Sequence, residues 1–142
     1  PNDIYEKKFL FFKKKAKTWI EVGALSWKDG EDMVAGFSNY GKEQVDIFAP
    51  GYQIYSTIPQ SEYATFSGTS MASPTVAGVA ALIRSYFPKL SAKKVKKILL
   101  KSAVTFDTDV KVPGMNGEKK SFKELSATGG VVNAYEAVKM AM

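Results

Sequence analysis

The chain has 142 residues, which is enough for one compact domain and too few for two. It is 45% hydrophobic and 24% charged, so it can bury a core and is not a disordered polymer. Cysteine and histidine are both absent, which excludes disulfides, thiolate metal sites and the commonest general base from this sequence.

The apolar runs and the first residues indicate whether the sequence contains a membrane span or a signal peptide. No apolar run reaches the roughly 20 residues that a membrane-spanning helix needs, so we expect no membrane span. The first residues do not have the pattern of a signal peptide, and residue 1 is proline rather than methionine. We therefore expect this sequence to be part of a longer chain.

Residues 1–17 form a basic and aromatic segment with neither strand-like alternation nor a helical stripe, and we predict a surface segment there. Its lysine and phenylalanine side chains are Lys7, Lys8, Phe9, Phe11, Phe12, Lys13, Lys14, Lys15 and Lys17. Such a mixture can bind a polyanion, because lysines attract phosphates and aromatic rings stack on bases. A solvated surface is the favoured interpretation, since the net charge of +6 is modest and Arg84 is the only arginine. We expect no nucleic-acid partner.

Short strands are predicted next, and helices after them. The strands are expected over residues 18–25, 45–49, 54–58 and 63–66, bounded by glycine, proline and asparagine. From residue 71 the apolar spacing becomes helical, and the first helix is apolar almost all round, which predicts a buried helix with Pro74 near its first turn. Ser91 is the expected N-cap of a second helix with Val95, Ile98 and Leu99 on its apolar face. Asn133 is expected to open a third helix.

Residues 105–129 are predicted to be loop with short extended pieces. Strands followed by helices indicate an α/β fold, although the chain is short of strands for a complete one.

The most informative stretch is Ser67-Gly68-Thr69-Ser70-Met71-Ala72-Ser73-Pro74. A strand is predicted to pass through Gly68 into the start of a helix, because glycine allows a tight backbone approach. Ser70 then lies where unpaired N–H groups and the positive end of the helix dipole collect, and those groups can stabilise an oxyanion. On geometry alone, however, Thr69 or Ser70 is better explained as an ordinary N-cap.

The wider residue string resembles the subtilisin-like serine peptidases, or subtilases. The nucleophile-serine segment of that family is similar to residues 66–82, and similar blocks occur in family order at residues 22–24, 37–41, 45–51, 90–99 and 130–134. The resemblance covers residues 18–140. It implies the C-terminal portion of a subtilisin-like fold, a parallel sheet with flanking helices, over residues 18–142.

By this resemblance Ser70 is the nucleophile of a serine endopeptidase and forms the acyl-enzyme. Its backbone N–H is one oxyanion donor, and Gly68, Thr69 and Met71 lie on the oxyanion and substrate side. Ser67 and Ser73 are expected to pack or hydrogen-bond rather than react. The partner implied is a peptide or protein substrate, and the location implied is exported: periplasmic, cell-envelope or secreted.

The sequence departs from a complete enzyme. In this family the triad order is Asp, His, Ser, yet the Asp and His motifs and the oxyanion asparagine are missing. Thr75 stands where many relatives have a histidine that is not the triad base. A serine hydroxyl is a poor nucleophile without an adjacent base, so we expect this chain to be inactive alone and to need the missing N-terminal part of the domain. A non-catalytic scaffold descended from a peptidase is the alternative, and a polyanion-binding module is a weaker one.

We expect no cofactor or metal in this chain. Calcium is possible in the larger protein, since some subtilases bind it, but the acidic residues Asp29, Glu31, Asp32 and Asp46 do not have the spacing of a calcium loop.

Overall fold

The computed structural model describes residues 7–9, 12–14 and 18–142, with side chains from Thr18 onward. A small antiparallel hairpin comes first, formed by β1 (Lys7–Phe9) and β2 (Phe12–Lys14). The remaining strands are β3 (Val22–Leu25), β4 (Ile47–Pro50), β5 (Ile54–Ile58), β6 (Glu62–Phe66), β7 (Val104–Thr105), β8 (Asp109–Lys111), β9 (Lys119–Ser121) and β10 (Gly130–Val131). The α-helices are α1 (Thr69–Tyr86), α2 (Ala92–Lys101) and α3 (Ala134–Ala141). Three short 3-10 helices are η1 (Gly30–Asp32), η2 (Pro59–Ser61) and η3 (Phe122–Glu124).

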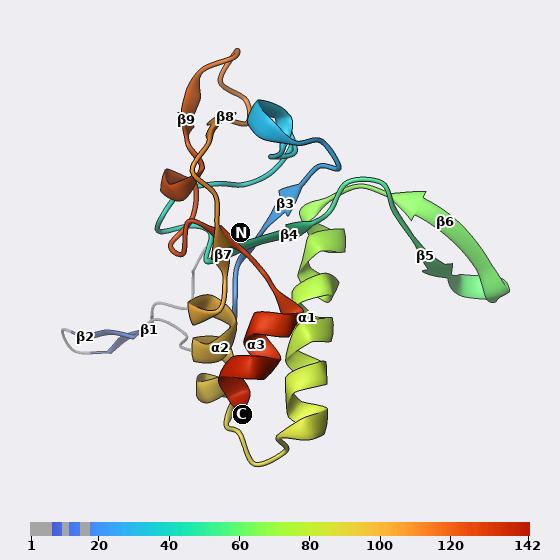
Figure 1. Ribbon diagram of the computed structural model, residues 1–142, viewed down its shortest axis with the longest axis vertical. Helices are drawn as coiled ribbons and strands as arrows, with labels where there is room; N and C mark the ends of the chain where they lie inside the picture. Colours follow the sequence, from blue (N-terminus) through green and yellow to red (C-terminus); the bar gives the residue numbers. More distant parts are fainter. Residues whose placement is uncertain (1–6, 10–11, 15–17) are drawn as a thin grey trace.

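The main sheet has four strands in the order β3–β4–β10–β7. β3 and β10 both run parallel to β4, and only β7 is antiparallel to its neighbour. The three helices lie together below this sheet, and α1 contacts both β3 and β4 (Figure 1). The predicted α/β fold with a parallel sheet and flanking helices is therefore confirmed.

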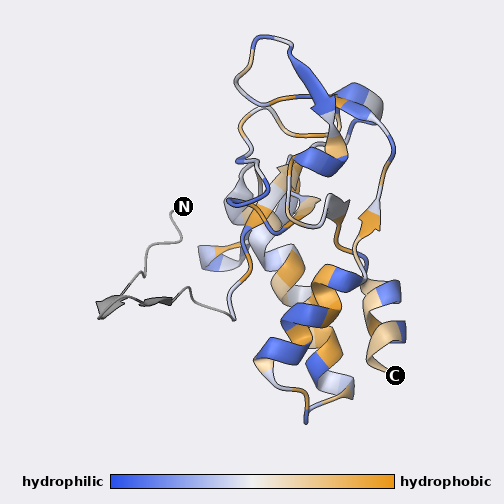
Figure 2. Cartoon of the chain, turned by 90° about the vertical axis from the view of Figure 1, so that its left-hand side faces the viewer, coloured by the Kyte–Doolittle hydropathy of each residue, from blue (hydrophilic) through white to orange (hydrophobic). Residues whose placement is uncertain are grey.

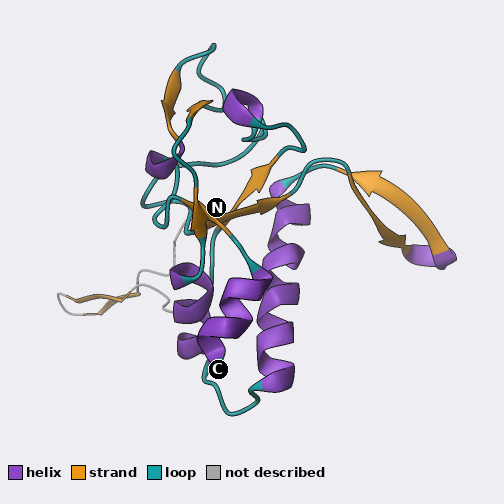
Figure 3. Cartoon of the chain, in the orientation of Figure 1, coloured by secondary structure: helices purple, strands orange, loops and turns teal. Residues whose placement is uncertain are grey.

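Alternation along the central strands divides the core between the two faces of the sheet. Successive side chains of a strand point to opposite faces. On β4, Ile47 and Ala49 join the core under the helices, whereas Phe48 packs on the other face against Phe122. The helix-side cluster consists of Ala24, Ala35, Ile47, Ala49, Ala72, Val76, Ile83, Val95, Ile98, Leu99 and Ala137. Figure 3 shows the helices on one side of the sheet and the β8–β9 hairpin on the other.

The two shorter helices begin at the residues that the sequence predicts. The Ser91 Oγ accepts the N–H of Lys94 at 3.3 Å, and the Asn133 side chain accepts the N–H of Glu136 at 3.0 Å. Each cap satisfies one of the four N–H groups that a helix start leaves unpaired. α2 buries Val95, Ile98 and Leu99, as expected, and hydrophilic residues occupy its outer turns (Figure 2).

The prediction that α1 is buried all round is wrong. Only Ala72, Val76 and Ile83 are buried, and the opposite face is exposed. Its exposed residues include Ser70, Ser73, Pro74, Ala77, Gly78, Ala81 and Leu82. Pro74 also lies in the second turn of the helix rather than the first, so its ring nitrogen cannot donate to the carbonyl of Ser70. The spacing of apolar residues in α1 is typical of a helix that packs against other elements on both faces. In this chain only one face of α1 is packed.

One further expectation needs correction. The strand predicted over residues 18–25 begins only at Val22, which pairs with Ile47, the first residue of β4. The Glu21 carbonyl accepts the N–H groups of Asp46 and Ile47, but residues 18–21 do not belong to the strand. Within the segment 1–17, predicted to be a surface segment, residues 7–9 and 12–14 form the β1–β2 hairpin. The expected surface role of its side chains lies outside the described residues. None of the helices in the described ranges is long and apolar enough to cross a membrane.

Lys96 is half-buried, whereas the other lysines of α2 are exposed. Its Nζ donates to the Trp19 carbonyl at 2.6 Å and lies 3.0 Å from the Asp46 carboxylate. The same carboxylate accepts the N–H of Glu21 at 3.1 Å. This lysine therefore ties α2 to the segment before β3 and to the start of β4.

We predict that Lys96→Met lowers the free energy of unfolding by about 1–2 kcal/mol, because it leaves the half-buried Asp46 carboxylate without its cation. Urea denaturation measures the change. Lys97→Met is the matched control, since Lys97 is exposed on the same helix, and it should stay within about 0.5 kcal/mol of wild type. Equal losses in the two variants would contradict the assignment.

Glu31 of η1 joins the β8–β9 hairpin through two lysines. It pairs with Lys111 at 2.9 Å and with Lys119, and Lys111 also pairs with Asp32 at 3.0 Å. Hydrogen bonds from Lys119 and then Lys111, reinforced by their charge, lower the pKa of Glu31 from 4.5 to about 2. A hydrogen bond to Glu31 in turn raises the pKa of Lys111.

A lowered carboxyl pKa stabilises the fold above the unfolded-state pKa, and that contribution is lost as pH falls through the folded-state pKa. We therefore predict that wild type is more stable than Glu31→Gln above pH 4.5 and that the difference disappears as pH falls toward about 2. Urea midpoints measured across this range provide the test. A difference that does not change with pH would contradict the role of the carboxylate charge.

Candidate active site

A short turn connects β6 to α1 and is held against the carboxyl end of the sheet. The N–H of Gly68 donates to the carbonyl of Gly51 at 2.7 Å, and Gly51 N–H donates to Leu25 at the end of β3 at 3.1 Å. The Gly68 carbonyl then accepts Met71 N–H at 3.0 Å and Ala72 N–H at 3.3 Å, which begins the helix. The turn is thus fixed from both sides.

The glycine that this contact requires is Gly51 rather than Gly68. A Cβ on Gly51 would lie 2.8 Å from the Gly68 carbonyl oxygen, 2.8 Å from the Ala24 Cβ and 3.0 Å from the Ala72 Cβ. A Cβ on Gly68 would meet nothing closer than 3.6 Å. The close approach inferred from the sequence is real, but the residue without a Cβ that permits it follows β4.

Ser70 is exposed at the second position of α1. The N-cap is Gly68, and no side chain caps this helix, so the alternative that Thr69 or Ser70 serves only as the N-cap is wrong. Within the described part of the chain, neither the Ser70 hydroxyl nor its backbone N–H has a hydrogen-bond partner. A hydroxyl and an unpaired N–H therefore lie together at the positive end of an 18-residue helix.

Ser70 borders a pocket of about 470 Å³ between the start of α1 and the segment that leads into β3. The pocket is lined by Trp19, Ile20, Glu21, Val22, Asn39, Thr69, Ser70 and Ser73. Among the described residues no lysine lines it, so no described lysine is placed to act as a base for Ser70. Gly68 and Met71 adjoin Ser70 in the turn but do not line the pocket, and Met71 is half-buried.

The other candidate residues of the turn have ordinary contacts. Ser67 Oγ accepts the N–H of Gln53 at 2.8 Å, as expected for a hydrogen-bonding residue. Ser73 faces the pocket one turn after Thr69. The Thr75 hydroxyl donates to the Met71 carbonyl at 3.3 Å within the helix.

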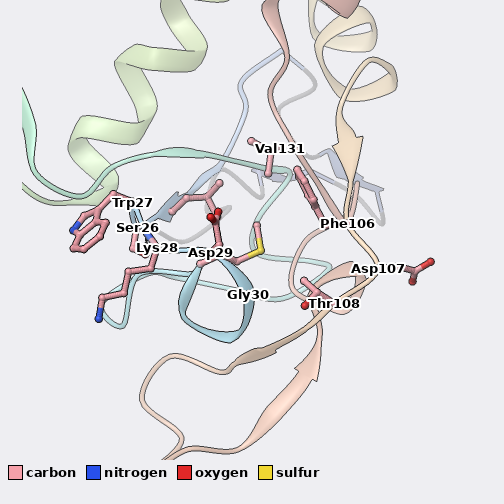
Figure 4. A pocket seen from close by; sticks show the side chains of 11 residues that line it. Ser26, Trp27, Lys28, Asp29, Gly30, Phe106, Asp107, Thr108 and Val131 are labelled. Carbon is pink, nitrogen blue, oxygen red and sulfur yellow. Dashed lines mark hydrogen bonds between the residues drawn. The ribbon is translucent and has the colours of Figure 1, made fainter.

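A second pocket of about 430 Å³ lies beyond the carboxyl end of β3, and its lining includes Trp27, Asp29, Phe106 and Val131 (Figure 4). The side chains of Lys28 and Asp107 point away from it. Among the described residues no group of three or more Asp, Glu, His or Cys could hold a metal ion. Glu31, Asp32 and Asp46 instead pair with lysines.

Two features of the site were not predicted from the sequence. Gly51 was visible only as a turn residue after Pro50, and its contact with Gly68 joins segments 17 residues apart. Trp19 was assigned to a strand, yet it lines the Ser70 pocket and is 41% exposed. Neither contact leaves a periodic signal in the sequence.

Ser70 thus lies exposed at a strand-to-helix turn beside the carboxyl ends of the parallel strands β3 and β4, within an α/β fold. The family model described as the subtilase family matches residues 7–131. The chain therefore belongs to the subtilase family, as its sequence motifs predict, and this membership supports a peptidase function.

Individual proteins that match the chain are consistent with this family assignment. The chain is 48% identical to Subtilisin DY of Bacillus licheniformis over 84 residues, which is 59% of this chain and 29% of that protein. It is 39% identical to thermitase of Thermoactinomyces vulgaris over 121 residues, 82% of this chain and 36% of thermitase. A solved structure of the subtilase cytotoxin SubAB superposes with a TM-score of 0.67 at 32% identity, covering 86% of this chain and 36% of that one. The chain thus spans between 29% and 36% of the length of these relatives.

We predict that Gly51→Ala lowers the free energy of unfolding by about 1–3 kcal/mol, because its methyl group would overlap the Gly68 carbonyl and two alanines. Urea denaturation measures the loss. The matched control is Gly36→Ala, where an added Cβ meets nothing within 4 Å and the change should stay within about 0.5 kcal/mol. A Gly51 variant as stable as the control would show that the turn is not tightly packed.

Proposed function

We propose that this chain is the C-terminal part of a subtilisin-like serine endopeptidase domain, over residues 18–142, and that Ser70 is its nucleophile. The observation that carries the proposal is the Ser70 hydroxyl, exposed, without a hydrogen-bond partner among the described residues, and facing a pocket at a helix start. Family membership supports peptide-bond hydrolysis as the reaction.

In the proposed reaction the Ser70 Oγ attacks the carbonyl carbon of a peptide bond and transfers its proton to a base. The unpaired N–H of Ser70 is suited to donate to the oxyanion that forms, because it is preorganised and already at the helix start. The base then returns the proton to the leaving amine, the C–N bond breaks, and an acyl-enzyme remains. Water hydrolyses this ester and restores the hydroxyl.

We propose that the base comes from outside this chain. The sequence contains no histidine, and among the described residues no lysine lines the pocket. A serine hydroxyl without a base is a weak nucleophile, so we propose that the isolated chain does not turn over peptides. The polypeptide that supplies the base would also supply the acidic triad member and a second oxyanion donor.

The neighbours of Ser70 have supporting roles in this proposal. Gly68 receives the contact that positions the turn, and Thr69 forms part of the pocket wall. Met71, half-buried beside the nucleophile, forms a wall on the substrate side. The substrate would be a peptide or protein, and we propose an exported location for the whole protein. Family membership makes calcium binding by the whole protein a further proposal, and none of the described residues is assigned to it.

A non-catalytic scaffold is the second candidate, and the absence of histidine is the observation that favours it. The sequence of the longer protein discriminates between the two. An upstream histidine motif, aspartate motif and asparagine would support the enzyme, and their absence would support the scaffold.

The test is labelling with a fluorophosphonate probe, which reacts with activated serines. We predict that this chain alone is labelled no faster than Ser70→Ala, whereas the longer protein that contains it is labelled at Ser70. Ser85→Ala is the control, because Ser85 lies on the same helix and donates to the Leu82 carbonyl at 2.8 Å. It should not reduce labelling of the longer protein.

Two outcomes would contradict the proposal. Rapid labelling with peptide turnover by the isolated chain would show that it has its own base. A longer protein that contains the histidine motif but is not labelled at Ser70 would rule Ser70 out as the nucleophile.

A further inference from the structure

The helix α2 carries positive charge where a helix is stabilised by negative charge. Its sequence, Ala92–Lys101, contains five lysines and no acidic residue. Lys93 and Lys94 lie in the first turn, where the helix dipole stabilises anions and destabilises cations. The stability of the helix therefore does not account for these two lysines.

The lysines of α2 also repel one another. Lys97 lies four residues from both Lys93 and Lys101, and Lys94 lies three residues before it. Side chains at these spacings are neighbours on a helix surface, and like charges there destabilise the helix. A residue pattern that breaks a local rule of stability marks a candidate functional surface.

The charge of Lys96 is balanced, because its Nζ lies 3.0 Å from the Asp46 carboxylate. The ammonium groups of the other four lysines of α2 have no carboxylate or hydrogen-bond partner among the described residues. Elsewhere in the chain, Lys111 and Lys123 do pair with acidic side chains. An anion bound along α2 would therefore meet cations that no described carboxylate neutralises.

A groove of about 340 Å³ lies between α2 and α3, and lysines border it. The two helices contact each other and lie side by side (Figure 1). The groove is lined by Lys94, Lys97, Ile98, Lys101 and Met140. Ile98 is buried, whereas Met140 of α3 is 47% exposed. The groove thus combines a row of three cations from α2 with a small apolar surface.

The lining of the groove indicates the class of anion. Among the described residues no aromatic ring and no arginine borders it, so it has no surface on which the bases of a single-stranded nucleic acid would stack. The backbone groups of its two walls are bonded within helices, so the groove has no strand edge with which a peptide could pair. Lysine binds an anionic oxygen as a point charge, without the fixed orientation that a guanidinium imposes.

We propose that the groove between α2 and α3 binds an acidic polysaccharide, whose sulfate or carboxylate groups contact Lys94, Lys97 and Lys101. The C–H groups of a sugar ring would pack on Met140. The groove shares no lining residue with the Ser70 pocket, so this inference goes beyond the proposed function and does not depend on it. Binding there would hold the protein on an anionic polysaccharide and leave the pocket accessible.

The test is isothermal titration of the full chain with a heparin hexasaccharide, a sulfated probe of defined length. The groove variant is Lys94→Gln/Lys97→Gln/Lys101→Gln. The control variant, Lys28→Gln/Lys42→Gln/Lys120→Gln, loses the same charge from lysines that do not line the groove. Circular dichroism checks that both variants fold.

At about 50 mM salt, where surface charges are weakly screened, we expect saturable binding that the groove variant weakens at least about tenfold and the control variant less than about threefold. Each lysine that contacts the polyanion releases a counterion, so the plot of log affinity against log salt should be shallower by about 2 in the groove variant. The probe should also raise the melting temperature of wild type and not that of the groove variant, because a ligand that binds the native state stabilises it.

Three results would overturn the proposal. The first is the absence of saturable binding. The second is an equal loss of affinity in the groove and control variants, which would show attraction by net charge alone. The third is tighter binding of an oligothymidylate of equal charge that the groove variant also weakens, which would assign the groove to nucleic acid. Because Ser70→Ala should bind the probe as wild type does, a failure of Ser70 to react with fluorophosphonate would leave this result unaffected.

Discussion

The site depends on one backbone hydrogen bond, the 2.7 Å contact from Gly68 N–H to the Gly51 carbonyl. It joins the turn before α1 to the turn after β4, and the absence of a Cβ on Gly51 permits the distance. The long β5–β6 hairpin between these glycines extends away from the sheet, with Tyr55 and Tyr63 stacked and exposed (Figure 1). This contact brings the end of the hairpin back to the sheet directly before α1 begins at Thr69.

For the chemistry of the site, this means that the turn holds the backbone of Ser70 in place while its hydroxyl makes no hydrogen bond to a described residue. Ser70 neither caps its helix nor bonds to a described neighbour, and Pro74 removes the helical donor to its carbonyl. The buried side of α1 fixes the helix through Ala72 and Val76, while its other side is exposed. The exposed face of α1 and the absence of histidine occur in a chain whose matched segments cover only 29% of Subtilisin DY and 36% of thermitase.

Much of the fold could be predicted from the sequence because its signals are local. The caps Ser91 and Asn133 and the periodicity of α2 depend on residues within one or two turns, and the motif around Ser70 identified the family. The errors concern long-range packing. Periodicity showed that α1 is suited to burial on both faces, but it could not show which face this chain covers. The Gly51 contact and the Lys96 bonds join distant segments, so they leave no local pattern.

Amide hydrogen exchange around the turn tests the central claim most directly. The account predicts that the amide of Gly68 is strongly protected because it is bonded to Gly51, and that Met71 is protected by the Gly68 carbonyl. The amides of Thr69 and Ser70 should exchange at nearly unprotected rates, since both are free to meet an oxyanion. A Gly68 amide that exchanges as fast as Thr69, or a protected Ser70 amide, would contradict the account.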